Sequence, residues 1–314
     1  MLKAALVGVG GISGAHIPAW EAMDDVELVA LCDIRPEQMK DYSDKHCYTD
    51  FNEMLDNEDI DILDICLPTY LHADYSITAM EKGINVICEK PISLNKDDVA
   101  RVYKTAEDNN VKFMVAQVLR FWPEYEIIKK LYDEKTYGDL LSGSMRRLGC
   151  YPAWSWDGWM MDENRSGLVP FDLHIHDLDF LVYAFGEPKN FECNRARRPE
   201  QDYLSTTYKY KDFFVNSEAS WYASPYPFTA SFLFQFEGAV AAWEGGKLTI
   251  YEKDGNIFNP VGAAENDTGD IGLPASDAYA NEIRYFTDCV INDITPCKVK
   301  AEQLETVIDI LNSL

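Results

Sequence analysis

Five short, almost continuously apolar runs in the first 120 residues constrain the fold of this chain most. Amphipathic stretches with helical spacing separate them, for example residues 71–83 and 96–110. Strands that are buried on both faces read as unbroken apolar runs, and strand–helix alternation builds a parallel sheet covered by helices. We therefore expect a parallel α/β domain over residues 1–120. The five runs are KAALVGVG, VELVALCD, IDILDICLP, INVICEKP and VKFMVAQV.

Several stretches after residue 120 alternate between apolar and polar residues. In residues 228–237 an aromatic residue or alanine occupies most alternate positions, and mostly polar residues lie between them. A period of two places one face of a strand against a core and the other in a more polar environment. We expect residues 121–314 to form an α+β domain with a large, mostly antiparallel open sheet, closed by helices over residues 278–293 and 300–314.

The composition indicates a globular protein with an acidic surface. Hydrophobic residues make up 47% of the 314 residues, and the formal net charge is −25. This charge repels phosphate backbones and anionic lipids, so we expect neither a nucleic acid nor a membrane as partner. The chain has no apolar run of about 18 residues and no signal-peptide pattern. Its eight scattered cysteines form no C-x-x-C pair, which predicts reduced thiols in a cytoplasmic protein.

A glycine-rich turn follows the first apolar run directly. Gly8, Gly10 and Gly11 have the spacing of a tight turn whose backbone approaches a pyrophosphate, and the helix expected after it offers free N–H groups. Ile12 continues the turn. Ser13 takes the place of the third glycine in the G-x-G-x-x-G pattern, and its small side chain still fits between helix and strand. An ordinary tight turn has the same spacing, but the place between a strand and a helix favours a cofactor site.

An aspartate near the end of the second apolar run lies twenty residues after Ser13. A carboxylate at this distance accepts hydrogen bonds from the adenosine ribose and repels a 2′-phosphate, so Asp33 favours NAD over NADP. Arg35 either stacks on the adenine or holds a 2′-phosphate, which leaves NADP possible. Together with the glycine turn, this pattern predicts a dinucleotide-binding Rossmann domain.

The run INVICEKP places Glu89 and Lys90 at the end of an expected parallel strand. In open α/β sheets, ligands bind outside the carboxyl ends of the strands. A Glu–Lys dipeptide is often only a surface ion pair. Its position beside the expected cofactor crevice favours a functional lysine.

Segments 8–16, 67–91, 171–180 and 281–296 together carry a family resemblance. The chain resembles the Gfo/Idh/MocA family of NAD(P)-dependent sugar and inositol oxidoreductases over essentially its whole length. The resemblance implies that Lys90 lies by the nicotinamide and hydrogen-bonds the substrate hydroxyl, and that residues 68, 69 and 72 line the cofactor. The expected cofactor-binding residues are Gly8, Gly10, Gly11, Ile12, Ser13, Asp33, Arg35, Pro68, Thr69, His72, Glu89 and Lys90.

The segment FDLHIHDLDF contains two histidines and three aspartates. Its apolar residues have helical spacing, and on a helix Asp172 and His176 share a face with Asp179 further along the same side. In a strand, His174 and His176 would share a face instead and could bind a metal, as in metal-dependent hydrolases. The apolar period favours the helix, so we expect no metal.

The family pattern Asp-x-Gly-x-His-x-x-Asp matches Asp172, His176 and Asp179. The resemblance implies that His176 accepts the proton and that Asp172 contacts the substrate and orients the site. Lys90, Asp172 and His176 are therefore the expected catalytic residues. His174 takes the usual glycine position, and it is either a substrate contact or a partly buried, backbone-bonded histidine.

Further substrate contacts are expected mainly from the second domain. The resemblance points to Arg120, which lies in a segment like the family's Asn-x-Arg-Phe, and to Tyr279 near the start of the closing helix. Residues 151–159 hold the densest aromatic cluster, including Tyr151 and Trp154. Aromatic rings suit the apolar faces of sugars, but such a cluster also occurs in a core or a subunit contact.

These features predict an NAD(P)-dependent oxidoreductase that transfers a hydride between the nicotinamide and a secondary alcohol of a sugar, polyol or inositol. Two other functions stay open: a cofactor-binding regulator of the same fold without turnover, and a metal-dependent hydrolase that uses the H-x-H segment. The register of Lys90, Asp172 and His176 favours the enzyme. The aromatic-rich sheet predicts a homodimer or homotetramer joined through the second domain.

Overall fold

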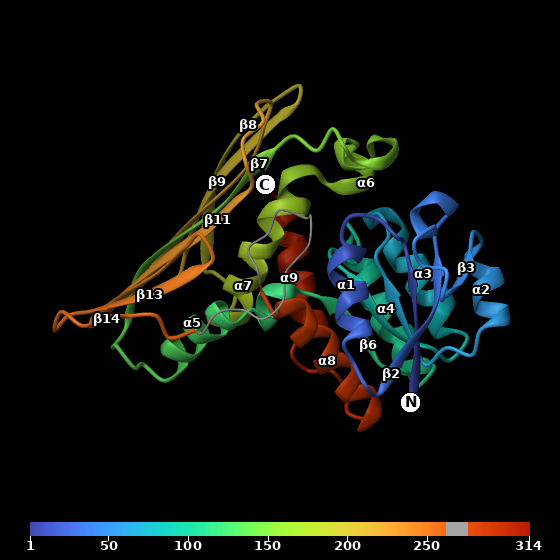
Figure 1. Ribbon diagram of the computed structural model, residues 1–314. Helices are drawn as coiled ribbons and strands as arrows, with labels where there is room; N and C mark the ends of the chain where they lie inside the picture. The colour runs from blue at the N-terminus through green and yellow to red at the C-terminus, as the bar shows by residue number, and fades with distance from the viewer. Residues whose placement is uncertain (262–275) are drawn as a thin grey trace. The chain divides into compact units, whose positions relative to one another are not determined.

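The computed structural model describes residues 1–261 and 276–314, and the chain folds into two compact units (Figure 1). Of the described residues, the first unit contains 1–118 and 278–304. The second unit contains the remainder, chiefly residues 119–261. We describe each unit by itself.

The first unit is built on a parallel sheet of six strands in the order β3-β2-β1-β4-β5-β6. This order reverses between β1 and β4, the point where open α/β sheets bind ligands at the carboxyl ends of the strands. The buried, unbroken apolar runs thus form a Rossmann-type sheet, as the sequence predicts. The strands are β1 (Leu2–Val7), β2 (Val26–Cys32), β3 (His46–Tyr48), β4 (Ile62–Ile65), β5 (Asn85–Glu89) and β6 (Phe113–Ala116).

Helices connect these strands and cover the sheet. The apolar face of α4 illustrates why, because Val99, Val102 and Ala106 repeat at helical spacing and are buried. Asn95 caps the start of this helix by accepting from the Asp97 N–H. The connecting helices are α1 (Ser13–Glu21), α2 (Phe51–Asn57), α3 (His72–Met80) and α4 (Lys96–Asp108).

Helix α8 (Ala278–Ile291) packs on the first unit, against α1. The sequence analysis places this segment with the second domain, as a helix that closes it. Arg284 pairs with Asp25 at 2.7 Å, and the apolar side chains Ile283 and Phe286 are fully buried. These contacts join α8 to residues more than 250 positions earlier, a link that no local pattern reveals.

The second unit contains an eight-stranded sheet in the order β14-β13-β12-β11-β7-β10-β9-β8. Its pairs are antiparallel except β7 with β10, which run parallel. The predicted mostly antiparallel open sheet is therefore confirmed. The strands are β7 (Leu140–Cys150), β8 (Asn190–Arg198), β9 (Gln201–Lys209), β10 (Phe214–Tyr222), β11 (Thr229–Phe236), β12 (Ala239–Glu244), β13 (Lys247–Glu252) and β14 (Ile257–Phe258).

Helices α5 (Pro123–Asp133) and α7 (Ile175–Phe185) lie on one face of this sheet (Figure 1). The alternation in β11 supplies that face, because Phe232, Phe234 and Phe236 are buried while Thr229 and Gln235 are exposed. Tyr125 of α5 packs edge-on against Phe180 of α7 and Phe232 of the sheet, both at 4.9 Å between ring centroids. The short helix α6 (Glu163–Ser166) and the final helix α9 (Ala301–Asn312) complete the described elements.

The cysteines and the described helices bear on compartment and membrane association. All eight cysteines are free thiols, and Cys66 and Cys88 are buried within the first unit. Among the described helices, none combines the length and the apolar character that a membrane span requires.

Candidate functional site

The glycine turn after β1 has the geometry of a phosphate cradle. Gly8 has a φ of +95°, and a Cβ atom added there would lie 2.6 Å from the Cys66 carbonyl oxygen, so only glycine fits. A Cβ added at Gly10 or Gly11 would meet no heavy atom within 4 Å. The Ser13 hydroxyl donates to the Gly10 carbonyl oxygen at 2.7 Å and is buried at the start of α1. The turn therefore leaves room for a pyrophosphate at a helix N-terminus.

Asp33 is fixed beside this turn. Its carboxylate accepts from the Val9 N–H at 2.9 Å and from the Arg35 N–H at 2.8 Å. The Arg35 guanidinium also reaches the same carboxylate, with Nε at 3.2 Å. Asp33 is buried, so its position at the end of β2 is set by these bonds. A carboxylate held in this place beside the glycine turn fits a ribose site.

Replacing Asp33 with serine is expected to shift cofactor preference toward NADP by about tenfold, equivalent to about 1.4 kcal/mol. The substitution removes the carboxylate that repels a 2′-phosphate and leaves Arg35 to bind that phosphate. Titration of the wild type and the variant with NAD and NADP measures the ratio. Asp108→Ser, which removes an exposed carboxylate from α4, controls for the change in net charge. A wild type that already binds NADP more tightly contradicts this interpretation.

The turns that follow β4 and β5 are tied together by His72. Its ring nitrogens lie 2.7 Å from the Pro91 carbonyl oxygen and 2.6 Å from the Leu67 carbonyl oxygen. His72 and Thr69 are buried, whereas Pro68 and Lys90 are partly exposed. His72 therefore holds the two turns together. Pro68 and Lys90 are the members of this group with surface available to a ligand.

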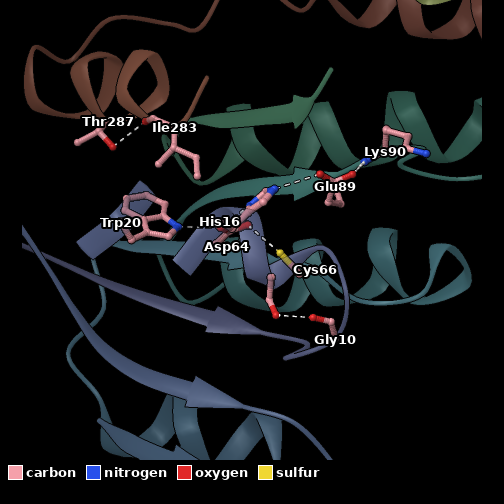
Figure 2. A network of polar contacts seen from close by, with 10 residues as sticks. Gly10, His16, Trp20, Asp64, Cys66, Glu89, Lys90, Ile283 and Thr287 are labelled. Atoms are coloured by element: carbon pink, nitrogen blue, oxygen red, sulfur yellow. Dashed lines mark hydrogen bonds and ion pairs between the residues drawn. The ribbon is translucent and has the colours of Figure 1, made fainter. Parts of the chain in front are cut away.

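A buried polar network lies directly beneath these turns (Figure 2). His16 of α1 lies between two carboxylates, with Nδ1 2.8 Å from Asp64 Oδ2 and Nε2 3.1 Å from Glu89 Oε1. Asp64 also accepts from Trp20 Nε1 at 2.7 Å, and the Cys66 thiol lies 3.6 Å from its other oxygen. Burial is the largest single effect and lowers the pKa of His16, but Asp64 and Cys66 together raise the pKa well above its usual value.

The sequence analysis missed this network, although a signal was present. Asp64 stands in the middle of the apolar run IDILDICLP, and a carboxylate within a strand buried on both faces needs a charged or hydrogen-bonded partner.

In the second unit, the segment around FDLHIHDLDF is helical, as predicted. A π-helical turn over Pro170–His174 leads into α7. Asp172 and His176 are partly exposed, whereas Asp177 is buried. The Asp172 carboxylate accepts from Trp221 Nε1 at 3.2 Å, which anchors it to β10. Trp221 is a second site residue that the sequence analysis missed.

His174 is an internal side chain, which corrects its assignment as a substrate contact. It is fully buried, with Nε2 2.7 Å from the Tyr208 hydroxyl and Nδ1 3.4 Å from the Ser217 hydroxyl. Burial and the nearby Arg147 lower its pKa to about 3, so the ring is neutral. Its partners are side chains of the sheet, not the backbone as the alternative expected.

Arg120 and Asp179 form a buried ion pair, which corrects two expectations. The Arg120 guanidinium binds both oxygens of Asp179, at 2.6 and 2.8 Å, and both residues are almost fully buried. Arg120 is therefore not presented to a substrate, and Asp179 does not accompany the outward-facing Asp172 and His176. The reason is electrostatic: a buried carboxylate requires a cation, and Arg120 supplies it.

The aromatic residues divide between core and surface. Tyr151 and Trp159 pack against a core cluster that includes Met160 and Trp221, and the Tyr151 ring meets Trp221 edge-on at 6.1 Å. Trp154 is 73% exposed. Tyr151 thus lies in the packing that holds Trp221, the partner of Asp172. Trp154 and Trp156, which is 39% exposed, have ring surface available to a ligand.

Tyr279 does not belong to the second unit. It lies in α8 of the first unit, is 5% exposed, and its ring centroid is 5.6 Å from that of His16. Tyr279 therefore packs against the buried network around His16 and is not presented to a substrate, contrary to the expectation from the sequence.

Two protein-family models match the chain. An oxidoreductase family with an NAD-binding Rossmann fold matches residues 2–117, and a GFO/IDH/MocA C-terminal domain matches residues 125–255. The D-apiose dehydrogenase of Paraburkholderia graminis is 28% identical over 199 residues, which are 62% of this chain and 52% of that protein. The levoglucosan dehydrogenase of Pseudarthrobacter phenanthrenivorans is 28% identical over 205 residues, which are 59% and 52% of the two chains.

The chain therefore spans about half the length of the curated relatives it matches. A solved levoglucosan dehydrogenase in complex with NADH and levoglucosan has the same fold. Its TM-score is 0.84 at 18% identity, and the comparison covers 99% of this chain and 95% of that one.

Proposed function

The chain belongs to the Gfo/Idh/MocA oxidoreductase family, and from this premise we propose that it transfers a hydride between a nicotinamide dinucleotide and a secondary alcohol of a sugar, polyol or inositol. One observation carries the proposal: Gly10 and Gly11 leave space for a pyrophosphate, with Asp33 fixed beside them. The names of the relatives, which refer to D-apiose and levoglucosan, support a polyhydroxylated substrate. NAD is the favoured cofactor because Asp33 disfavours a 2′-phosphate.

Three side chains supply the remaining chemistry in this proposal. The glycine turn and Asp33 would hold a nicotinamide dinucleotide, which would supply the hydride acceptor or donor. His176 takes the proton of the hydroxyl, since an imidazole is a base near neutral pH. Lys90 stabilises the developing alkoxide with its positive charge, and Asp172, anchored by Trp221, orients the hydroxyl and the base. Trp154 offers an exposed ring to an apolar sugar face.

The two competing functions have less support. A metal-dependent hydrolase requires His174 and His176 on one face, but the segment is helical and His174 is bound inside the second unit. A cofactor-binding regulator without turnover does not require Lys90, Asp172 and His176, because it catalyses no reaction.

Turnover assays separate these functions. The protein should reduce NAD, followed by the absorbance of the reduced cofactor, with at least one member of a panel of aldoses, polyols, inositols and anhydrosugars. NADP should support a slower reaction. A Lys90→Ala protein purified in parallel reports contaminating activity. Tight NAD binding without turnover of any panel member favours the silent regulator, and no NAD binding contradicts the proposal entirely.

Assembly through the outer face of the second sheet is a further part of the proposal. Phe214, Leu233 and Tyr251 are 45%, 42% and 46% exposed, and they project from the face opposite the buried Phe232 and Phe234. Apolar side chains gathered on one sheet face favour self-association with two-fold symmetry.

We expect light scattering at micromolar concentration to give the mass of a dimer or a tetramer. Leu233→Lys, which places a charge at the centre of this face, should lower the mass to that of the monomer without unfolding the protein. A monomeric wild type contradicts the assignment of this face as an interface.

A further inference from the structure

The network around His16 is fully buried, yet the proposed function gives it no task. Its members come from three elements of the first unit: His16 from α1, Asp64 from β4 and Glu89 from the end of β5. His16 and Asp64 are 0% exposed, and Glu89 is 6% exposed. Burying three ionisable groups is costly unless they are paired in good geometry.

The geometry favours the charged form of His16. Each ring nitrogen faces a carboxylate oxygen, at 2.8 and 3.1 Å. A neutral imidazole has one N–H, so it would turn a lone pair toward one of the two carboxylates. An imidazolium donates from both nitrogens and places one positive charge between two negative ones. The groups that face His16 are Asp64 and Cys66 on the β4 side, Glu89 on β5, Trp20 on α1 and Tyr279 on α8.

Glu89 connects His16 to Lys90. One Glu89 oxygen meets His16 Nε2, and the other accepts from the Lys90 backbone N–H at 3.0 Å. Figure 2 shows the Lys90 side chain extending away from Glu89. The carboxylate that His16 neutralises therefore holds the backbone of Lys90 and leaves the lysine side chain directed elsewhere.

We propose that His16 is a positioning residue that acts on Lys90 through Glu89. The role of Lys90 itself rests on the proposed function. The positive charge of His16 fixes the Glu89 carboxylate, and Glu89 fixes the Lys90 backbone at the end of β5. Without that charge, Glu89 loses its counterion in a buried site and either takes up a proton or turns toward another cation. Both changes release Lys90 from its position.

A metal ion is the competing explanation for the cluster. Ligand atoms of His16, Asp64 and Cys66 all lie within 4.8 Å of one another. The hydrogen bonds of the network already account for this spacing, because His16 Nδ1 lies 2.8 Å from Asp64 Oδ2 and Trp20 Nε1 donates to the same oxygen at 2.7 Å. A metal bound there would displace the proton on Nδ1.

Nuclear magnetic resonance tests the positioning directly, without substrate or cofactor. Labelling with carbonyl-¹³C glutamate and ¹⁵N lysine selects amides of lysines that follow glutamate. The sequence has such lysines at 82, 90, 135 and 253, so three signals serve as internal controls. In His16→Asn and in Glu89→Gln, the Lys90 signal should move while the other three stay. The double variant should add little to either single change, because both remove the same link.

Kinetics tests the consequence. His16→Asn and Glu89→Gln should each lower kcat by about tenfold to a hundredfold, the scale of a small misplacement of a reacting group. The thermal midpoint of the Glu89→Gln protein should fall, because the substitution removes a buried counter-charge of His16, so kcat is compared at a temperature where the variant is still folded. His46→Asn removes a surface imidazole–carboxylate pair from the same unit and should change neither kcat nor the Lys90 signal.

The outcomes separate the two proposals. An unmoved Lys90 signal in His16→Asn overturns the positioning role whatever the activity. Stoichiometric zinc in the purified protein that His16→Asn abolishes also overturns it, in favour of a metal site. A moved Lys90 signal in a protein that oxidises no alcohol supports the positioning role and contradicts the proposed function.

Discussion

Lys90→Ala and His176→Ala are each expected to lower turnover by about a hundredfold or more, the usual scale for losing alkoxide stabilisation or acid–base catalysis. Oxidation of a hydroxyl requires a base for its proton and a cation beside the resulting charge. Steady-state assays on the best substrate of the panel measure the effect. NAD affinity should survive His176→Ala, because the cofactor phosphates are assigned to the glycine turn of the other unit.

His174→Ala is the matched control, since it removes the other imidazole of the same segment. His174 is buried against Tyr208 and Ser217, so its loss should reduce the stability of the protein rather than the chemical step. If His174→Ala abolishes turnover while the His176→Ala enzyme stays fully active, the assignment of the base is wrong.

Asp179→Asn is expected to cost about 3–5 kcal/mol of stability, since it leaves the Arg120 guanidinium buried without its counter-charge. Loss of this size is a large share of the stability of a typical domain. Urea unfolding followed by tryptophan fluorescence measures it in the second unit, because six of the seven tryptophans, all but Trp20, lie between residues 122 and 243.

An exposed ion pair in the same unit provides the comparison. Asp133 pairs with Lys129 one helical turn earlier on α5, and Asp133→Asn should change stability by at most about 0.5 kcal/mol. Equal effects for the two variants would show that the Arg120–Asp179 pair contributes no more than a surface pair.

The sequence predicts those features that arise from local periodicity. The apolar runs of the first 120 residues identify five of the six strands of the parallel sheet, because a strand covered on both faces has no polar side. The sixth, β3 (His46–Tyr48), is short and largely exposed, and no apolar run marks it. Alternation identifies β11 and its burial pattern. The helical spacing after residue 170 identifies α7. In this helical segment Asp172 and His176 are partly exposed, whereas Asp177 is buried.

Features that depend on distant partners were not predictable in this way. Arg120 and Asp179 are 59 residues apart, and either one by itself reads as a surface or site residue. The parallel pairing of β7 with β10 and the packing of α8 on α1 also join segments with no shared pattern. The glycine turn is predictable in part, since positive φ at Gly8 follows from a known turn, whereas the His16 network requires the positions of three separate elements.

Hydride transfer is the central claim, and isotopic labelling tests it most directly. The protein is incubated with saturating NAD and the best panel substrate, carrying deuterium at the carbinol carbon to be oxidised. Mass spectrometry of the reduced cofactor should show that deuterium has moved to the nicotinamide, and Lys90→Ala should slow its appearance about a hundredfold or more. Conversion of the substrate with no deuterium in the nicotinamide would contradict the account.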